Sequence, residues 1–136
     1  MRKECGLWIY SCVICTAFCT VAAPGQQPKR EARCIPLVCA SGDCSLLAGA
    51  PLTAGMRSGF VRLAPDRTVG RHSTGKNEET LVILHGQGDA LLDGGKRLSF
   101  TAPTVVYFPP STFHDVLNTG KEALEYVYVV APATRQ

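Results

Sequence analysis

Residues 79–108 have the sequence ETLVILHGQGDALLDGGKRLSFTAPTVVYF, and this stretch decides the fold class. Short runs of β-branched and aliphatic residues alternate with turns that contain glycine or proline. The pattern predicts strands at residues 79–85, 89–92, 97–100 and 104–108, and it shows no helical periodicity. Several short strands separated by frequent turn signals are typical of a β-sandwich or a small barrel.

The same pattern continues on both sides of this stretch. It predicts strands at residues 59–64 and 68–72 upstream, and at residues 113–118 and 124–131 downstream. Because helices do not alternate with these strands, we predict an all-β fold and not a parallel α/β sheet. An eight-stranded jelly roll would protect most strand edges and would leave a barrel mouth for a ligand.

The last predicted strand leaves one choice open. Strand alternation places Tyr126 and Tyr128 on one face and Val127 and Val129 on the other. One pair should face the interior of the barrel, and periodicity alone does not say which.

The composition sets broad limits on the protein. A chain of 136 residues suits one domain, and a hydrophobic content of 46% is too high for a disordered chain. The net charge is +3, and no stripe of lysine and arginine appears along the sequence. A nucleic-acid partner is therefore not expected.

An uncharged segment, residues 6–23 (Gly6 to Ala23), follows two basic residues near the start of the chain. This arrangement is typical of a signal peptide, here with cleavage expected after Ala22. The segment is also long enough, at about 27 Å of helix, to stay in the membrane as an anchor. We expect residues 1–22 to be a signal peptide or membrane anchor, followed by a polar linker at 23–33. Either way the domain, residues 34–136, would lie outside the cytoplasm, secreted or periplasmic, and it would contact a membrane only if the segment stays uncleaved.

Three of the seven cysteines, Cys34, Cys39 and Cys44, lie beyond the apolar segment. In an oxidising compartment they predict one disulfide and one odd thiol, and three pairings are possible. A thiolate metal site is less favoured, because the tight CxxC spacing of zinc sites is absent.

Histidine and carboxylate side chains indicate a different metal site. His72, Glu79 and His114 together offer two imidazoles and one carboxylate, which suit Fe, Mn, Zn, Ni or Cu. Two histidines and one carboxylate with open positions are typical of non-haem iron oxygenases. His85 precedes a glycine turn and is expected at the surface, and Glu78 should point to the opposite face from Glu79.

Two motifs resemble those of the cupin superfamily. The first family motif is Gly, five residues, His-x-His, three or four residues, Glu, six residues and Gly. The corresponding residues here are Asp66, His72-Ser73-Thr74, Glu79 and Gly86. The second family motif is Gly, five residues, Pro-x-Gly, two residues, His, three residues and Asn. Its counterparts are Pro103, Pro109-Pro110-Ser111, His114 and Asn118.

The resemblance covers about residues 59–132 and implies a single cupin jelly-roll barrel, also called a double-stranded β-helix. Asp66, Pro103 and Ser111 replace family glycines at turn positions, which tolerate these residues. Asn118 is expected to cap a turn.

The resemblance also implies a function. Thr74 stands where the family has its second metal histidine, which leaves His72, Glu79 and His114 to hold a divalent transition metal. Thr74 itself would line the pocket or hydrogen-bond a metal-bound water, because a threonine is not a convincing ligand. The first hypothesis is a metal-dependent enzyme of the oxidase or dioxygenase type that acts on a small molecule. The alternative is a non-catalytic module that binds a sugar or other small ligand and has lost or weakened its metal site. A third hypothesis is a structural role as a homodimer, since cupins commonly dimerise through sheet edges.

Overall fold

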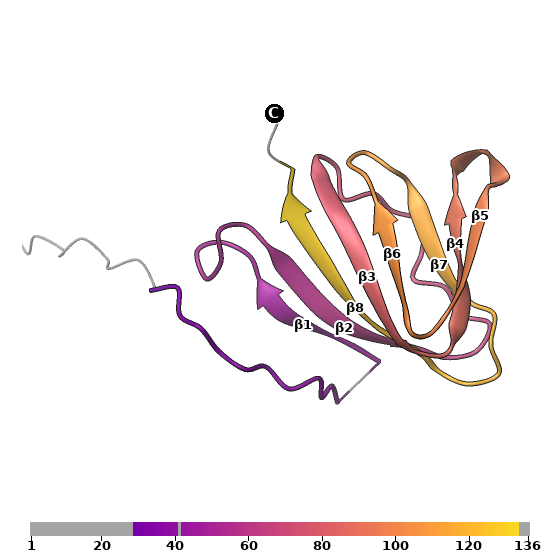
Figure 1. Ribbon diagram of the computed structural model, residues 1–136, viewed down its shortest axis with the longest axis horizontal. Helices are drawn as coiled ribbons and strands as arrows, with labels where there is room; N and C mark the ends of the chain where they lie inside the picture. Colours follow the sequence, from indigo (N-terminus) through magenta and orange to yellow (C-terminus); the bar gives the residue numbers. More distant parts are fainter. Residues whose placement is uncertain (1–28, 41, 134–136) are drawn as a thin grey trace, which may run out of the picture.

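The computed structural model describes residues 29–40 and 42–133, which form eight strands and one short 3-10 turn (Figure 1). The elements are β1 (Asp43–Ala48), β2 (Arg57–Leu63), β3 (Asn77–His85), β4 (Gln87–Leu92), η1 (Asp93–Gly95), β5 (Arg97–Thr101), β6 (Thr104–Phe108), β7 (His114–Asn118) and β8 (Leu124–Pro132). The predicted all-β fold is confirmed. The predicted signal peptide or anchor lies outside the described residues. Within the described part of the chain, no helix has the length and apolarity needed to cross a membrane.

The strands form two antiparallel sheets that face one another. The larger sheet has the order β1-β2-β8-β3-β6, and the smaller one has the order β5-β4-β7. In Figure 1 the larger sheet curves from β1 to β6, and the smaller sheet closes the far side of the barrel. This is the jelly-roll barrel that the sequence predicts, with β8 inserted between β2 and β3.

The core lies between the inner faces of the two sheets. Along β3, the buried side chains of Glu79, Leu81 and Ile83 alternate with the exposed side chains of Val82 and Leu84. The larger sheet buries apolar residues against Ala90, Phe100 and Val116 of the smaller one. A fully buried leucine, isoleucine or phenylalanine stabilises a fold by roughly 1.5–3 kcal/mol, so this inner face holds the two sheets together.

The strand predicted at residues 68–72 is wrong. The chain there is a loop that touches β7 through two isolated bridges, Thr68 with Leu117 and His72 with His114. Gly70 interrupts the extended backbone with a φ of +93°, a value that glycine adopts without steric cost. His72 therefore lies on a loop and not on a strand, and hydrogen bonds from Val69 and Gly70 also hold this loop to β7.

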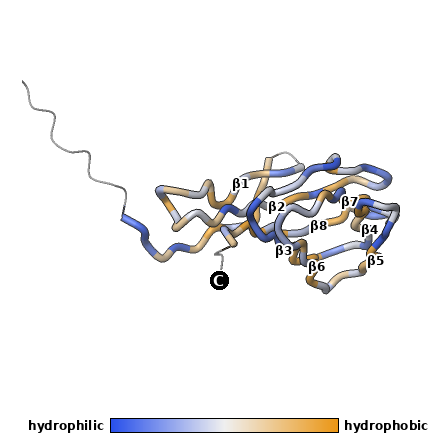
Figure 2. The backbone as a smooth tube through the Cα atoms, turned by 90° about the horizontal axis from the view of Figure 1, so that it is seen from above, coloured by the Kyte–Doolittle hydropathy of each residue, from blue (hydrophilic) through white to orange (hydrophobic). Residues whose placement is uncertain are grey.

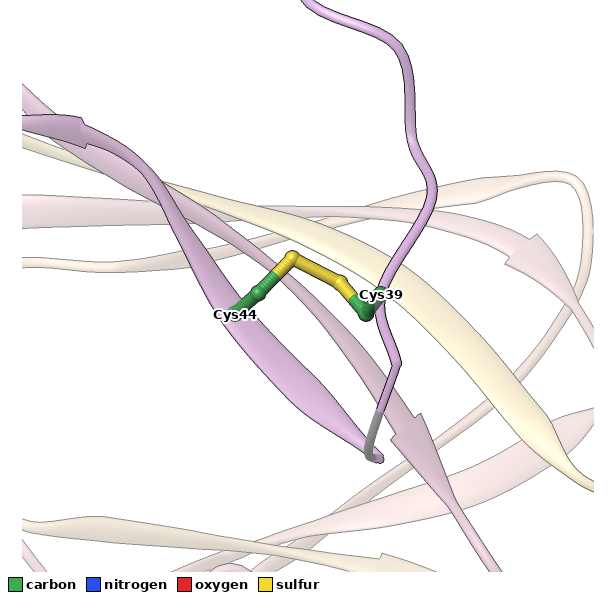
Figure 3. The surroundings of a disulfide bond; sticks show 2 residues. All are labelled: Cys39 and Cys44. Atoms are coloured by element: carbon green, nitrogen blue, oxygen red, sulfur yellow. A yellow bond between two sulfur atoms is a disulfide. The ribbon is translucent and has the colours of Figure 1, made fainter.

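The first strand, β1, was not predicted, because its sequence DCSLLA lacks β-branched and aromatic residues. It pairs with β2 at the edge of the larger sheet. A disulfide joins Cys39 to Cys44, which fixes the segment before β1 to the strand itself (Figure 3). Cys34 is exposed and forms no disulfide with another cysteine of the described residues.

The N-terminal segment runs from a polar start toward this disulfide. Figure 2 colours its first described residues blue, in line with the sequence KREAR at residues 29–33. In the same figure these residues lie away from β4, β5 and β7. Farther along, Leu37 and Val38 line a small hollow together with Phe60, which faces outward from β2. The segment thus covers part of the outer face of the larger sheet.

Candidate metal centre

Three residues that are distant in sequence meet at one end of the barrel interior. His72 comes from the loop before β3, Glu79 from β3 and His114 from the start of β7. Their ligand atoms lie within 4.8 Å of one another. Glu79 Oε2 is 3.3 Å from His114 Nε2 and 3.9 Å from His72 Nε2. The structure therefore brings together the three residues that the sequence predicts as metal ligands.

Backbone pairing holds the two histidines side by side. Each of His72 and His114 donates its backbone N–H to the carbonyl of the other, at 2.9 Å in both directions. The imidazole rings are 4.4 Å apart between centroids. This single bridge fixes the loop to β7 at the residue that carries the first ligand.

Hydrogen bonds orient both imidazole rings toward the cluster. His72 Nδ1 lies 2.9 Å from the carbonyl oxygen of Gly70, and His114 Nδ1 lies 3.1 Å from that of Thr112. A carbonyl oxygen only accepts, so each Nδ1 carries the hydrogen, and in a neutral ring Nε2 is then the atom with the free lone pair. Histidines that ligate metals are held in this way in known metal sites.

Two of the three side chains in the cluster are buried, which is unusual for charged or polar groups without hydrogen-bond partners. The side chains of Glu79 and His114 are 6% and 1% exposed, whereas that of His72 is 44% exposed. Glu79 Oε2 and His114 Nε2 are buried without a hydrogen-bond partner in the described structure. Their 3.3 Å contact does not have hydrogen-bond geometry. Because buried polar atoms are normally paired, these two atoms and His72 Nε2 fit a bound divalent cation.

Thr74 lies at the wall of the same cavity. Its hydroxyl donates to the carbonyl oxygen of Asn77 at 3.0 Å, which fixes the turn into β3. The hydroxyl hydrogen is used there, so the oxygen can only accept a further hydrogen bond from the cavity side. That property fits the predicted role toward a metal-bound water, which stays a prediction.

The cavity next to the cluster has a volume of about 460 Å³. Apolar and aromatic side chains make up much of its wall, and they come from both sheets and the loop: Leu47, Ala48, Val61, Val69, Leu81, Val116, Tyr126, Tyr128 and Val130. Apolar walls with a few polar groups are typical of sites for small organic ligands.

Strand alternation did not say which pair of β8 side chains faces the interior, and the structure shows that it is the tyrosines. Tyr126 and Tyr128 line the cavity. Burial raises the pKa of Tyr126 well above its usual value, and the charge of the nearby Glu79 raises it further. Tyr126 is therefore a neutral phenol across the physiological pH range, able to donate a hydrogen bond to a ligand.

The other histidine and the neighbouring glutamate lie where the sequence predicts. His85 is exposed, and its Nε2 is 2.9 Å from Glu122 Oε2. Glu78 is exposed and accepts a hydrogen bond from the Tyr107 hydroxyl at 3.1 Å. Neither belongs to the cluster.

Asn118, predicted as a turn cap, has a larger role. It is fully buried, and its Oδ1 accepts a hydrogen bond from the Gly120 N–H at 2.8 Å. Its Nδ2 donates to the carbonyl oxygens of Leu63 and Glu122, both at 2.8 Å. Asn118 thus joins three separate segments at the end of β7.

Sequence reasoning missed the part of the cavity wall that β1 and the start of β2 provide. Asp43 and Ser45 of β1 and Arg57 of β2 line the cavity. No local signal marks them, because only the pairing of β1 with β2 and of β2 with β8 brings them to the cavity.

Comparisons with known proteins agree with this architecture. Residues 59–130 match the model of the cupin domain family. The structure is similar to the cupin domain of Cnp3 from Schizosaccharomyces pombe, with 20% identity, a TM-score of 0.60, and coverage of 67% of this chain and 64% of that one. The chain thus spans less than two thirds of that protein's length. It is also similar to a protein described as a predicted oxalate decarboxylase from Thermotoga maritima, with 26% identity, a TM-score of 0.61, and coverage of 67% and 79%.

A third similar structure is a conserved protein with a double-stranded β-helix domain from Klebsiella pneumoniae. Its identity is 19% and its TM-score 0.62, and the match covers 78% of this chain and 95% of that one. No curated protein matches the chain. Because the family match spans more than half of the 136 residues and agrees with the observed two-sheet barrel, this protein belongs to the cupin family.

Proposed function

We propose that this protein is a metal-dependent cupin that acts on a small organic molecule, with oxidation by dioxygen as the reaction class. His72, Glu79 and His114 would hold the ion. One observation carries the proposal: Glu79 Oε2 and His114 Nε2 are buried without hydrogen-bond partners and lie beside His72 Nε2. Burial of an unpaired carboxylate is unfavourable, and a cation would remove that penalty.

A divalent iron or manganese ion, when bound, supplies Lewis-acid and dioxygen chemistry. The chain contributes orientation, since the Nδ1–H bonds of His72 and His114 direct their Nε2 lone pairs to one point. The Tyr126 phenol can donate a hydrogen bond to a ligand, and the Thr74 oxygen can accept one. The apolar wall limits the water around the reacting molecule.

The neighbour from Thermotoga maritima supports a small-molecule enzyme as the working hypothesis, since it is described as a predicted oxalate decarboxylase. We do not extend that substrate to this chain, because the cavity of about 460 Å³ is large for so small an acid.

The second candidate function is a non-catalytic module that binds a sugar or other small ligand. It is favoured by Thr74, which leaves three ligands where the family resemblance implies four. A weak or absent metal would turn the same cavity into a simple binding pocket.

We also propose that the domain works outside the cytoplasm and forms a homodimer. The disulfide between Cys39 and Cys44 supports an oxidising compartment. Val105 and Tyr107 on edge strand β6 are exposed apolar residues, which supports pairing through that edge.

Metal binding by the untagged full chain tests the proposed function. The protein is stripped with a chelator and titrated with Mn²⁺, Fe²⁺, Zn²⁺, Ni²⁺ and Cu²⁺, beside His72→Ala, Glu79→Gln and the matched control His85→Ala. We expect one ion per chain in the wild type and in His85→Ala. The two cluster variants should bind more than about 100-fold more weakly, since even losing the partner of a ligand costs 10–100-fold.

Two results would contradict the metal centre. One is a wild-type chain that is folded by circular dichroism and binds none of the five ions. The other is binding that is equally strong in all four proteins. Either result would favour the ligand-binding module, and a small-molecule binding screen would follow.

A further inference from the structure

Among the described residues, Arg57 is the one arginine or lysine that lines the cavity beside the candidate metal centre, and it is exposed to solvent. It begins β2, and the strand register pairs it with Val130 of β8, which in turn pairs with Glu79 of β3. These three residues form one row on the inner face of the sheet. Two strand spacings separate Arg57 from Glu79, or about 10 Å between Cα atoms.

The stem of Arg57 passes close to a glycine. A Cβ placed on Gly49 would be 3.1 Å from Arg57 Cγ, and Gly49 has a φ of +95°. A larger residue at position 49 would thus be strained and would crowd the stem. Because Gly49 has no side chain, the turn after β1 can accommodate the stem of Arg57.

The charge of Arg57 is not neutralised by its surroundings. Arg62, Arg71 and Arg97 each pair with a carboxylate at 2.7–3.0 Å. Within the described residues, Arg57 has no such partner. The other acidic residue of the cavity is Asp43, which lies opposite Val61 in the strand register. Val61 is four residues along β2 from Arg57, or about 13 Å between Cα atoms.

The unpaired charge of Arg57 itself favours an anion beside it, and a cation in the cluster would strengthen that preference. Arg57 and an ionised Glu79 cancel, so any divalent ion held by the cluster would give this half of the cavity a net positive charge. An arginine guanidinium binds a carboxylate through two parallel hydrogen bonds, which are stronger than neutral ones. Between Arg57 and Glu79 the row contains the apolar Val130, and Leu81 and Val116 also line the cavity.

From this geometry we infer that the ligand of the cavity is a small organic acid, whose carboxylate is bound by Arg57 and whose apolar body lies along Val130 toward the cluster. Arg57 is thus the specificity residue of the site. The inference deepens the proposed function, because it names the substrate class for the same cavity. It does not depend on the metal, since Arg57 and the apolar wall are parts of the chain itself.

The experiment compares 3-phenylpropanoate with its neutral amide, 3-phenylpropanamide, by calorimetric titration into the chelator-stripped full chain. The two probes differ only in the head group. The variants are Arg57→Gln and the matched control Arg62→Gln. Arg62 is, like Arg57, an exposed arginine of β2, but it pairs with Glu125 and does not line the cavity. We expect the wild type and Arg62→Gln to bind the acid about tenfold more tightly than the amide.

In Arg57→Gln the preference for the acid should fall to about one, while the amide should bind as in the wild type. Arg57→Lys should keep part of the preference, because the charge remains without the planar fork. Equal binding of acid and amide by the wild type would overturn the inference. So would a preference that persists in Arg57→Gln, or the absence of saturable binding by the acid.

A parallel metal titration separates this inference from the proposed function. If the stripped chain prefers the acid through Arg57 but binds no ion, the metal centre fails and the acid site stands. If the wild type binds one ion but shows no preference for the acid, the metal centre stands and the acid site fails.

Discussion

The two histidines of the candidate metal centre are placed in opposite ways. In residues 66–86 the first histidine, His72, is on an exposed loop with a positive φ two residues earlier, at Gly70. In residues 103–118 the second histidine, His114, is buried at the start of β7. Its ring stacks on Phe108 with centroids 3.7 Å apart and planes 5° from parallel.

The difference teaches how the candidate centre is built. The second motif is part of the core, so it fixes His114 by packing, and Glu79 on β3 is fixed in the same way. The loop that carries His72 lies outside the core and is attached to β7 by hydrogen bonds, which include those of Val69 and Gly70. Changes in the second motif should therefore affect folding, and changes in the loop that carries His72 should affect mainly metal binding.

The largest expected effect lies in the second motif, at Asn118. Asn118→Ala removes three hydrogen bonds and leaves the carbonyls of Leu63 and Glu122 and the N–H of Gly120 without this partner. Each buried group left unpaired costs about 1–3 kcal/mol, so we expect a loss of about 3 kcal/mol in the free energy of unfolding. Urea denaturation of the metal-free chain measures it. The exposed neighbour serves as control in Thr119→Ala, which should change stability by less than about 0.5 kcal/mol. Equal stability of the two variants would contradict the role given to Asn118.

The next effect compares the two histidines directly. His114→Ala removes a buried ring from its stack on Phe108 and should lower the stability of the metal-free chain by about 2 kcal/mol. The cost is smaller than for a buried phenylalanine, because the unpaired Nε2 atom is removed as well. His72→Ala removes a half-exposed ring and should cost less than about 0.5 kcal/mol. Urea midpoints of the two metal-free variants give the result. If the two variants lose the same stability, the contrast between a packed His114 and an exposed His72 is wrong.

The same contrast explains how much of the fold was predictable. The strands at 79–85, 104–108 and 124–131 are rich in β-branched and aromatic residues, and β3, β6 and β8 confirm them within two residues at each end. The strand at 68–72 was wrong, because the positive φ of Gly70 depends on how the loop meets β7. β1 was missed, because pairing with β2 and a disulfide hold it in place and its own residues do not favour a strand.

Some residues of the candidate site could be predicted from the sequence, and others could not. The three candidate ligands could be found from spacing, because each motif is a short stretch of sequence. The inward direction of Tyr126 and the position of Arg57 could not, because both depend on the register between β2, β8 and β3. Register is a contact between distant segments, and a single sequence does not display it.

The smallest expected effect comes from Thr74→His, which restores the family's fourth ligand close to the exposed His72. Thr74→His adds an imidazole at the cavity wall, next to His72, and should tighten binding of Mn²⁺ or Zn²⁺ by about tenfold. Loss of the hydrogen bond from Thr74 to Asn77 opposes the gain, since a net hydrogen bond contributes about 1 kcal/mol to the turn. Competition titration with a chelator dye measures the affinity in the full chain. The control is Thr80→His, which adds the same group at a neighbouring threonine of β3 that does not line the cavity, and it should leave the affinity unchanged. Unchanged or weaker binding by Thr74→His would mean that position 74 does not direct its side chain at the ion. In that case the centre would be a three-ligand site of His72, Glu79 and His114, and its open side would be available to the small-molecule ligand.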